Sequence, residues 1–323
     1  MKKAILSLTS LVLFTLSTFP VRADSVLTTI TVGAGPTDIA ANPRTNKIYV
    51  GVSNLGQVAV IDGKTQQVID RINAGGALVA VNVITNRIYS SRCSFNTASC
   101  NIAVINGNND KVVANIPIAS GSSIGLQGLA VNPITNRIYA SDADNNLYIV
   151  IDGNTNTIVT QVPVFTQPAG IAVNPKTNRI YVVGGGFPGE VLVYDGDTNA
   201  QLASIPEDFG VERIATNFRL DRVYVTNDSG ALIVVDGNTN QNIAQDPTGP
   251  FPDALDVNLL NSKIYVANGN GSSVTIIDGH TNLVLQTLPI PATSPRGVAV
   301  NLANGFTYVS DSASDKVVVL QPN

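Results

Sequence analysis

The chain of 323 residues is sparsely charged, with 13% Asp, Glu, Lys and Arg, a formal net charge of −4, 27 Gly, 17 Pro and no Trp. Val, Ile, Thr, Asn and Gly are frequent and helix-favouring residues are few, so we expect an all-β protein; closed β folds of this length commonly form one domain. The acidic balance excludes non-specific binding of nucleic acid or anionic membranes, which requires basic patches.

Residues 1–23 have the pattern of a cleavable secretory signal. Lys2 and Lys3 precede an apolar run over residues 4–19, and residues 21–23 (Val-Arg-Ala) end in the small residue that signal peptidase requires. The run is short for a membrane span, no second candidate span follows, and the cleavage point has no Cys for a lipid anchor. We expect a mature chain from Asp24 onward that is secreted or periplasmic. Loss of three cations and no acids changes its net charge to −7.

One unit recurs along almost the whole mature chain and is clearest over residues 170–205. It contains four short apolar runs separated by an Asn-Pro-x-Thr-Asn turn, a variable loop and an Asp-Gly-x-Thr-Asn turn. A Tyr in the second run marks the register of seven units: Tyr49, Tyr89, Tyr139, Tyr181, Tyr224, Tyr265 and Tyr308. Four strands in each period of about 40 residues are typical of a propeller blade. The sequence therefore predicts a single seven-bladed β-propeller over residues 24–323, with four antiparallel strands in each blade.

The turn residues suit chain reversal. Asn-Pro-x-Thr-Asn occurs at residues 42–46, 132–136 and 174–178, where Pro presets φ and Asn tolerates a left-handed backbone. Asp-Gly, a hairpin signal, ends the third run of five units, at Asp62, Asp152, Asp195, Asp236 and Asp278.

The two ends of the repeat array complement each other. The last unit stops after its third apolar run, residues 317–320, whereas residues 26–33 form an unattached run before the first unit. We predict that this N-terminal run supplies the fourth strand of the seventh blade, which closes the ring and hides both edges.

Cys93 and Cys100 are the only cysteines, and they lie in the longest unit. In an oxidising compartment we expect a disulfide between them. Closing so short a loop would stabilise the fold by roughly 2–3 kcal/mol on the chain-entropy model. The spacing matches neither a metal site nor a redox-active Cys-x-x-Cys pair.

The pattern Asn-Pro-x-Thr-Asn-Lys/Arg-Ile-Tyr-Val, followed by Val-x-Val-Ile-Asp-Gly-x-Thr-Asn, resembles the YVTN β-propeller repeat family. Residues 224–227 are Tyr-Val-Thr-Asn itself, and the likeness spans roughly residues 30–320. Residues 301–306 (Asn-Leu-Ala-Asn-Gly-Phe) depart most from the pattern. The resemblance implies a secreted, periplasmic or cell-surface propeller. The family has no common activity, although the related lactonase-type propellers are enzymes.

Function should lie where the units differ, on the face shared by the fourth-to-first and second-to-third strand connections. One residue from each unit should line the channel mouth on that face: Thr37, Ala77, Gln127, Ala169, Glu212, Asp253 and Arg296. Asp256 is unusual, because the other six units have Ala at its position. The candidates for a polar ligand or cation site are therefore Asp38, Gln127, Glu212, Arg213, Asp253, Asp256 and Arg296. The alternative is an ion-pair cluster, Asp256 with Arg213 or Arg296, that fixes the packing of blades.

Catalytic chemistry has little support in the sequence, and we name no catalytic residue. The single His, His280, stands in an Asp-Gly-His-Thr-Asn turn expected on the opposite face, which leaves His-dependent nucleophilic and His-rich metal sites without a basis. Ca²⁺ needs only oxygen ligands, and Glu212 and Asp253 with a neighbouring Asn are the candidates for holding it. We expect no other cofactor.

The leading hypothesis is a non-enzymatic, monomeric propeller that offers its loop face and channel mouth to a protein, a glycan or a small polar ligand. The alternative is a lactonase- or lyase-like hydrolase with a carboxylate-bound divalent cation at the mouth. The two hypotheses differ in whether the mouth binds a divalent metal.

Overall fold

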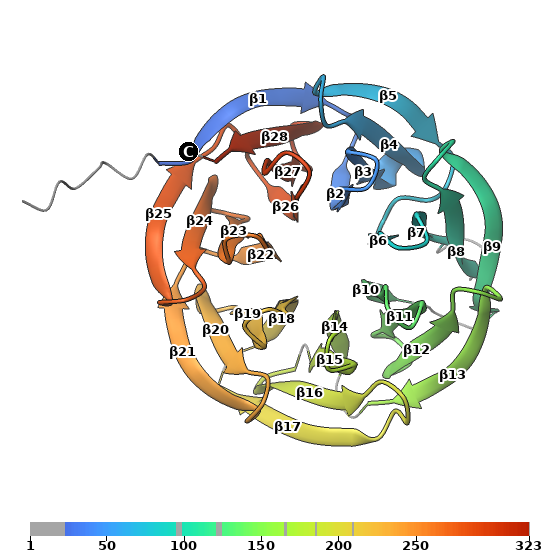
Figure 1. Ribbon diagram of the computed structural model, residues 1–323, viewed down its shortest axis with the longest axis vertical. Helices are drawn as coiled ribbons and strands as arrows, with labels where there is room; N and C mark the ends of the chain where they lie inside the picture. The colour runs from blue at the N-terminus through green and yellow to red at the C-terminus, as the bar shows by residue number, and fades with distance from the viewer. Residues whose placement is uncertain are drawn as a thin grey trace, which may run out of the picture.

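Seven four-stranded antiparallel sheets surround a common axis in the computed structural model (Figure 1). The structure describes residues 23–94, 99–120, 125–164, 167–184, 186–208 and 210–322. All of the predicted signal segment except Ala23 lies outside these ranges. Within the described residues, no helix is long and apolar enough to cross a membrane. The predicted all-β, seven-bladed propeller is confirmed.

In the first four blades the strands follow the chain from the axis outward. Blade one contains β2 (Pro36–Asn42), β3 (Lys47–Val52), β4 (Gln57–Asp62) and β5 (Gln67–Ile72), with the short 3-10 helix η1 (Ser53–Leu55). Blade two contains β6 (Val79–Asn82), β7 (Arg87–Ser94), β8 (Ser99–Asn106) and β9 (Lys111–Ser120). Blade three contains β10 (Leu126–Asn132), β11 (Arg137–Asp142), β12 (Leu147–Asp152) and β13 (Thr157–Pro163). Blade four contains β14 (Pro168–Asn174), β15 (Arg179–Gly184), β16 (Gly189–Asp195) and β17 (Gln201–Glu207).

Blades five and six repeat this order, and blade seven takes its outermost strand from the N-terminus. Blade five contains β18 (Val211–Asn217), β19 (Arg222–Asn227), β20 (Ala231–Asp236) and β21 (Gln241–Pro247). Blade six contains β22 (Pro252–Val257), β23 (Lys263–Asn268), β24 (Ser273–Asp278) and β25 (Leu283–Pro289). Blade seven contains β26 (Pro295–Val300), β27 (Thr307–Asp311), β28 (Lys316–Gln321) and β1 (Ser25–Thr31).

The core lies between neighbouring blades and is built mainly from their second and third strands. These strands are buried on both faces, which explains why they read as continuous apolar runs rather than as alternating ones. The second-strand tyrosines are all fully buried: Tyr49, Tyr89, Tyr139, Tyr181, Tyr224, Tyr265 and Tyr308. The outermost strands, such as β5, are largely exposed. The repeated Tyr therefore marks the packing of blade against blade.

Backbone conformation accounts for the Asn that ends the first turn in four of the seven blades. This position has a left-handed φ in all seven blades, at Asn46, Asn86, Asn136, Asn178, Asp221, Ser262 and Gly305. Asn, Asp and Gly are the residues that adopt this conformation most readily.

The same positions link neighbouring blades through side-chain hydrogen bonds. Asn132 at the end of β10 donates from Nδ2 to Asn178 Oδ1 of the next blade at 2.8 Å. Equivalent bonds join Asn42 to Asn86, Asn82 to Asn136, Asn174 to Asp221 and Asn301 to Asn46. In the described chain, the two interfaces of blade six lack this bond because Ser262 and Gly305 replace the amide acceptor.

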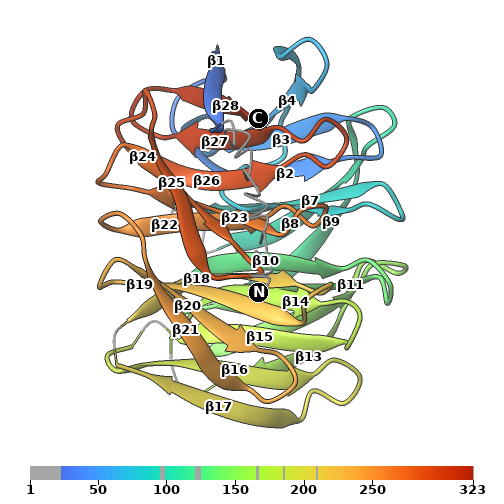
Figure 2. The ribbon, with the colours of Figure 1, turned by 60° about the vertical axis from the view of Figure 1, so that its left-hand side comes forward.

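The ring closes as predicted. Strand β1 pairs with β28 in antiparallel register from Ser25 opposite Gln321 to Thr31 opposite Lys316, and both views place the two strands side by side (Figure 1, Figure 2). This pairing covers the edge of β28 that would otherwise be open to another chain.

Two smaller predictions are also confirmed. Cys93 and Cys100 face each other across β7 and β8 and form a disulfide. His280 lies in the turn between β24 and β25, where its main-chain N–H donates to Asp278 Oδ1 at 2.7 Å.

Candidate functional site

A cavity of about 400 Å³ opens where the inner strands β2, β6, β10, β14, β18, β22 and β26 begin, and we call it the upper mouth. It lies on the predicted face. Five of the seven positions expected to line it do so: Thr37, Ala77, Gln127, Asp253 and Arg296. Ala169 and Glu212 are not part of its wall.

A β-bulge at the start of the inner strand explains why these side chains leave the regular sheet. In six of the seven blades the pairing of the first and second strands shifts register there. Gln127, for example, is the extra residue between Leu126 and Gly128, and Asp253 takes the same place in blade six. A bulged residue is unpaired in the ladder, and its side chain is re-aimed.

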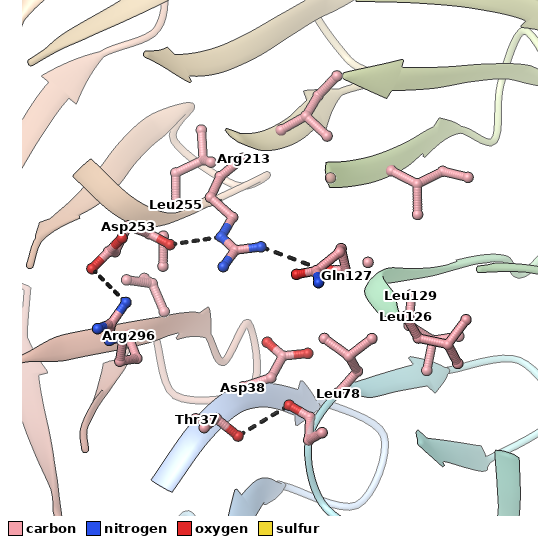
Figure 3. Close-up of a pocket in the computed structure, with 17 residues that line it drawn as sticks. Thr37, Asp38, Leu78, Leu126, Gln127, Leu129, Arg213, Asp253, Leu255 and Arg296 are labelled. Atoms are coloured by element: carbon pink, nitrogen blue, oxygen red, sulfur yellow. Dashed lines mark hydrogen bonds and ion pairs between the residues drawn. The ribbon is translucent and has the colours of Figure 1, made fainter. Parts of the chain in front are cut away.

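The side chain of Arg213 lies across the upper mouth (Figure 3). Its Nε donates to the main-chain carbonyl of Asp253 at 3.0 Å, and its Nη1 donates to that of Gln127, in blade three, at 3.3 Å. A guanidinium carries five N–H donors. No acceptor among the described residues bonds to Nη2, so the cation is fixed in place while part of it still faces the cavity.

Asp38 projects from β2 into the same cavity, on the side opposite Arg213 (Figure 3). Its carboxylate accepts from the main-chain N–H of Ile39 at 2.9 Å and from that of Val79 on β6 at 2.8 Å, so it joins blade one to blade two. Burial raises the pKa of Asp38, while the two main-chain donors and the charge of Arg213 offset part of the rise.

The rim of the upper mouth carries one ion pair and one nearby acid. Asp253 Oδ2 lies 3.2 Å from Arg296 Nη1; because the Arg296 side chain is 49% exposed, we expect the pair to contribute less than about 1 kcal/mol. Glu212 is exposed beside them. Partial desolvation, with the charges of Asp228 and Asp253, raises the pKa of Glu212, and Arg213 and Arg296 act in the opposite direction.

The predicted Ca²⁺ ligands do not form a cluster. Asp253 is engaged by Arg296, and Glu212 lies outside the cavity wall. Across the described ranges, no group of three or more His, Cys, Asp or Glu side chains is placed to hold a metal ion.

Asp256 lies apart from the other candidates. It lines a different cavity, at the opposite end of the channel, and its carboxylate accepts from the main-chain N–H groups of Val257 and Val300, each at 2.8 Å. The prediction that Asp256 pairs with Arg213 or Arg296 is wrong. Within the described chain, the Asp256 carboxylate is bound by main-chain N–H groups of blades six and seven instead of by a cation. Asp253 stands near the start of β22 and Asp256 near its end, so the two side chains reach opposite ends of the inner strand.

Two features of the channel escaped sequence analysis. One is the reach of Arg213, whose partner Gln127 is 86 residues away in the chain and two blades away in the ring. The other is the cavity at the opposite end of the channel. The sequence does indicate this cavity, because an apolar residue (Pro, Val, Phe or Leu) follows the Asn at the end of each first apolar run, and these residues line its wall.

Comparisons with known proteins do not assign the chain to a family. No model of a known protein family matches the chain, and no curated protein matches it. The propeller fold therefore rests on the structure, and the likeness to YVTN repeats stays an interpretation of the repeated motif.

Proposed function

We propose that the protein is a non-enzymatic binding propeller of YVTN type, secreted or periplasmic, whose upper mouth holds a small polar ligand by an anionic group. The observation that carries this proposal is the Arg213 guanidinium, fixed by two main-chain carbonyls and facing a cavity of about 400 Å³. A fixed guanidinium with unused donors suits carboxylate and phosphate groups. The cavity also has a volume in the range of small-molecule sites.

The other polar groups of the wall favour a ligand with hydroxyl or amino groups beside its anionic group. Asp38 offers carboxylate lone pairs across the cavity from Arg213, and Gln127 can both donate and accept. A sugar acid or a hydroxy acid combines these features. A small polar ligand therefore fits this cavity better than a protein or a long glycan does.

The state of the charged side chains supports binding rather than catalysis. Arg213 is held by carbonyls, Asp38 by two main-chain N–H groups, and Asp253 by Arg296. Groups fixed in this way are pre-organised to orient a ligand, and none of these contacts joins a nucleophile to a base.

Isothermal titration calorimetry with a panel of sugar acids, hydroxy acids and their neutral amide analogues tests the proposal. An acid that binds should lose roughly 10- to 100-fold in affinity in Arg213→Gln, as expected for one charge-assisted contact. Arg92→Gln is the matched control, because Arg92 is exposed on β7 and lines neither cavity.

Three results would contradict the proposal. If neutral analogues bind as tightly as the acids, Arg213 does not hold the anionic group. The same follows if an acid binds Arg213→Gln as tightly as it binds the wild type. Binding that requires Ca²⁺ or Mg²⁺ and disappears with chelator would favour the hydrolase alternative instead.

A further inference from the structure

A second cavity, of about 820 Å³, lies at the other end of the channel, and we call it the lower mouth. Each of the seven blades supplies two residues to the wall of this cavity: the residue before the Asn at the end of the inner strand and the residue after that Asn. These are Val131 and Pro133 in blade three, and Val257 and Leu259 in blade six. Phe218 adds an aromatic ring in blade five. The wall is therefore apolar around almost its whole circumference.

Two charged side chains line this apolar cavity, Asp256 on the inner strand of blade six and the exposed Lys176 in a turn of blade four. Asp256 accepts one main-chain hydrogen bond on each carboxylate oxygen, from Val257 and Val300. Among the described residues, no Lys, Arg or His lies within ion-pair distance of it. A carboxylate can accept about four hydrogen bonds, so lone pairs remain for a ligand.

The fold does not require a carboxylate at this position. The other six blades have Ala there, and their inner strands form without it: Ala40, Ala80, Ala130, Ala172, Ala215 and Ala299. A desolvated carboxylate without a cation is unfavourable, so Asp256 is an energetic cost that an incoming cation would offset.

Electrostatics in the channel also favour a cation at this point. The pKa of Asp256 is raised to about 6, mainly by burial and also by the negative charge of Asp38, although the two main-chain donors act in the opposite direction. Asp256 is therefore mostly ionised at neutral pH, in a channel that holds a second carboxylate.

We propose that the lower mouth binds a small organic ammonium ion, whose apolar body packs against the ring of Val, Pro and Leu side chains and whose nitrogen donates to Asp256. The volume of the cavity lies in the range of small-molecule sites, and its mostly apolar wall with few charged groups matches their usual composition. This site is separate from the upper mouth, and the proposal does not depend on the ligand proposed there.

Calorimetric titration with benzylammonium and with benzyl alcohol, a neutral probe of similar shape, isolates the charge contribution. At pH 7.5 the wild-type protein should bind the ammonium ion roughly tenfold or more tightly than the alcohol, as expected for a charge-assisted hydrogen bond. Asp256→Asn should remove this preference. Asp246→Asn should retain it, because desolvation also raises the pKa of Asp246, but Asp246 lies on the outermost strand β21 and does not line the cavity.

The pH dependence of the wild type gives a second test that needs no substitution. Asp38 and Lys176 are the other charged groups near the site, and Asp256 takes up a proton near pH 6. The preference for the ammonium ion should therefore shrink between pH 7.5 and pH 5. Equal affinities for the two probes at pH 7.5, a preference that survives Asp256→Asn, or one that is unchanged at pH 5 would each overturn the proposal.

Discussion

Replacing Asp24 with alanine tests how the ring is held closed. The Asp24 carboxylate lies immediately before β1, is 1% exposed, and accepts from Lys263 Nζ at 2.8 Å and from Tyr265 Oη at 2.7 Å in blade six. Its main-chain carbonyl also accepts from Gln286 Nε2 at 3.0 Å. Asp24 thus anchors the one strand that reaches its blade from the other end of the chain.

The structure sets the size of the effect. Asp24→Ala removes the acceptor from one ammonium and one hydroxyl group, and a hydrogen bond to a charged group contributes about 1.5–3 kcal/mol. The Lys263 side chain is 20% exposed and can regain water, whereas Tyr265 is fully buried and cannot. We expect the free energy of unfolding to fall by about 3 kcal/mol, and Tm by roughly 5 °C for a domain of this size.

Thermal and urea unfolding would measure this loss, with Asp110→Ala as the matched control. Asp110, in the turn before β9, accepts the equivalent pair of bonds, from Lys47 Nζ at 2.5 Å and Tyr49 Oη at 2.8 Å, but within a continuous stretch of chain. The two variants should lose similar stability. Only Asp24→Ala should also accelerate amide hydrogen exchange in β1 (Ser25–Thr31), because Asp24 directly precedes the strand that closes the ring.

An Asp24→Ala protein that melts at the wild-type temperature, beside a destabilised Asp110→Ala protein, would refute this reasoning. Ring closure would then depend on the pairing of β1 with β28 alone. Residues 317–320 of β28 are buried, so the apolar contacts of β28 would then be the main source of stability for the closed ring.

Three further predictions concern the disulfide, the pH dependence and metals. Reduction of the Cys93–Cys100 disulfide should lower the free energy of unfolding by about 2 kcal/mol, and an unchanged melting curve with reductant would contradict the loop-closure account. The pKa of Asp256 is raised to about 6 in the folded state, so the folded protein binds this proton more tightly and its stability falls as the pH rises from about 4 to about 6. The Tm of Asp256→Asn minus that of the wild type should therefore be larger at pH 7.5 than at pH 4.5. An equal difference in Tm at both pH values would contradict this. Ca²⁺ or Mg²⁺ should shift Tm equally in the wild type, Glu212→Ala and Asp253→Ala; a metal-dependent rise that both substitutions abolish would support the hydrolase alternative.

The fold was predictable because each of its requirements is local and is repeated. A buried Tyr such as Tyr139 is needed at every interface, and a residue such as Asn136 that tolerates a left-handed φ is needed in every first turn. The missing fourth strand of the last unit and the extra strand over residues 26–33 similarly follow from counting strands.

The candidate site was only partly predictable because its geometry depends on contacts between blades. Alignment of the units selects the bulge positions, and most of them line the upper mouth. The direction of a long side chain such as that of Arg213 depends on carbonyls two blades away, which no repeat pattern reveals. For Asp256, opposite charges in the sequence suggested an ion pair, but the N–H groups on the open edges of the inner strands compete for the carboxylate.

Those open edges also explain why ligand sites in this molecule should differ at the two mouths. The inner strand of each blade pairs on one side only, so its other side can carry varied residues without disturbing the sheet. Stability instead depends on the buried tyrosines, the amides between blades and the closure at Asp24. Arg213 at one end and Asp256 at the other are therefore charges that the ring tolerates rather than needs. Opposite charges in separate cavities favour ligands of opposite charge, an anion in the upper mouth and an ammonium ion in the lower one.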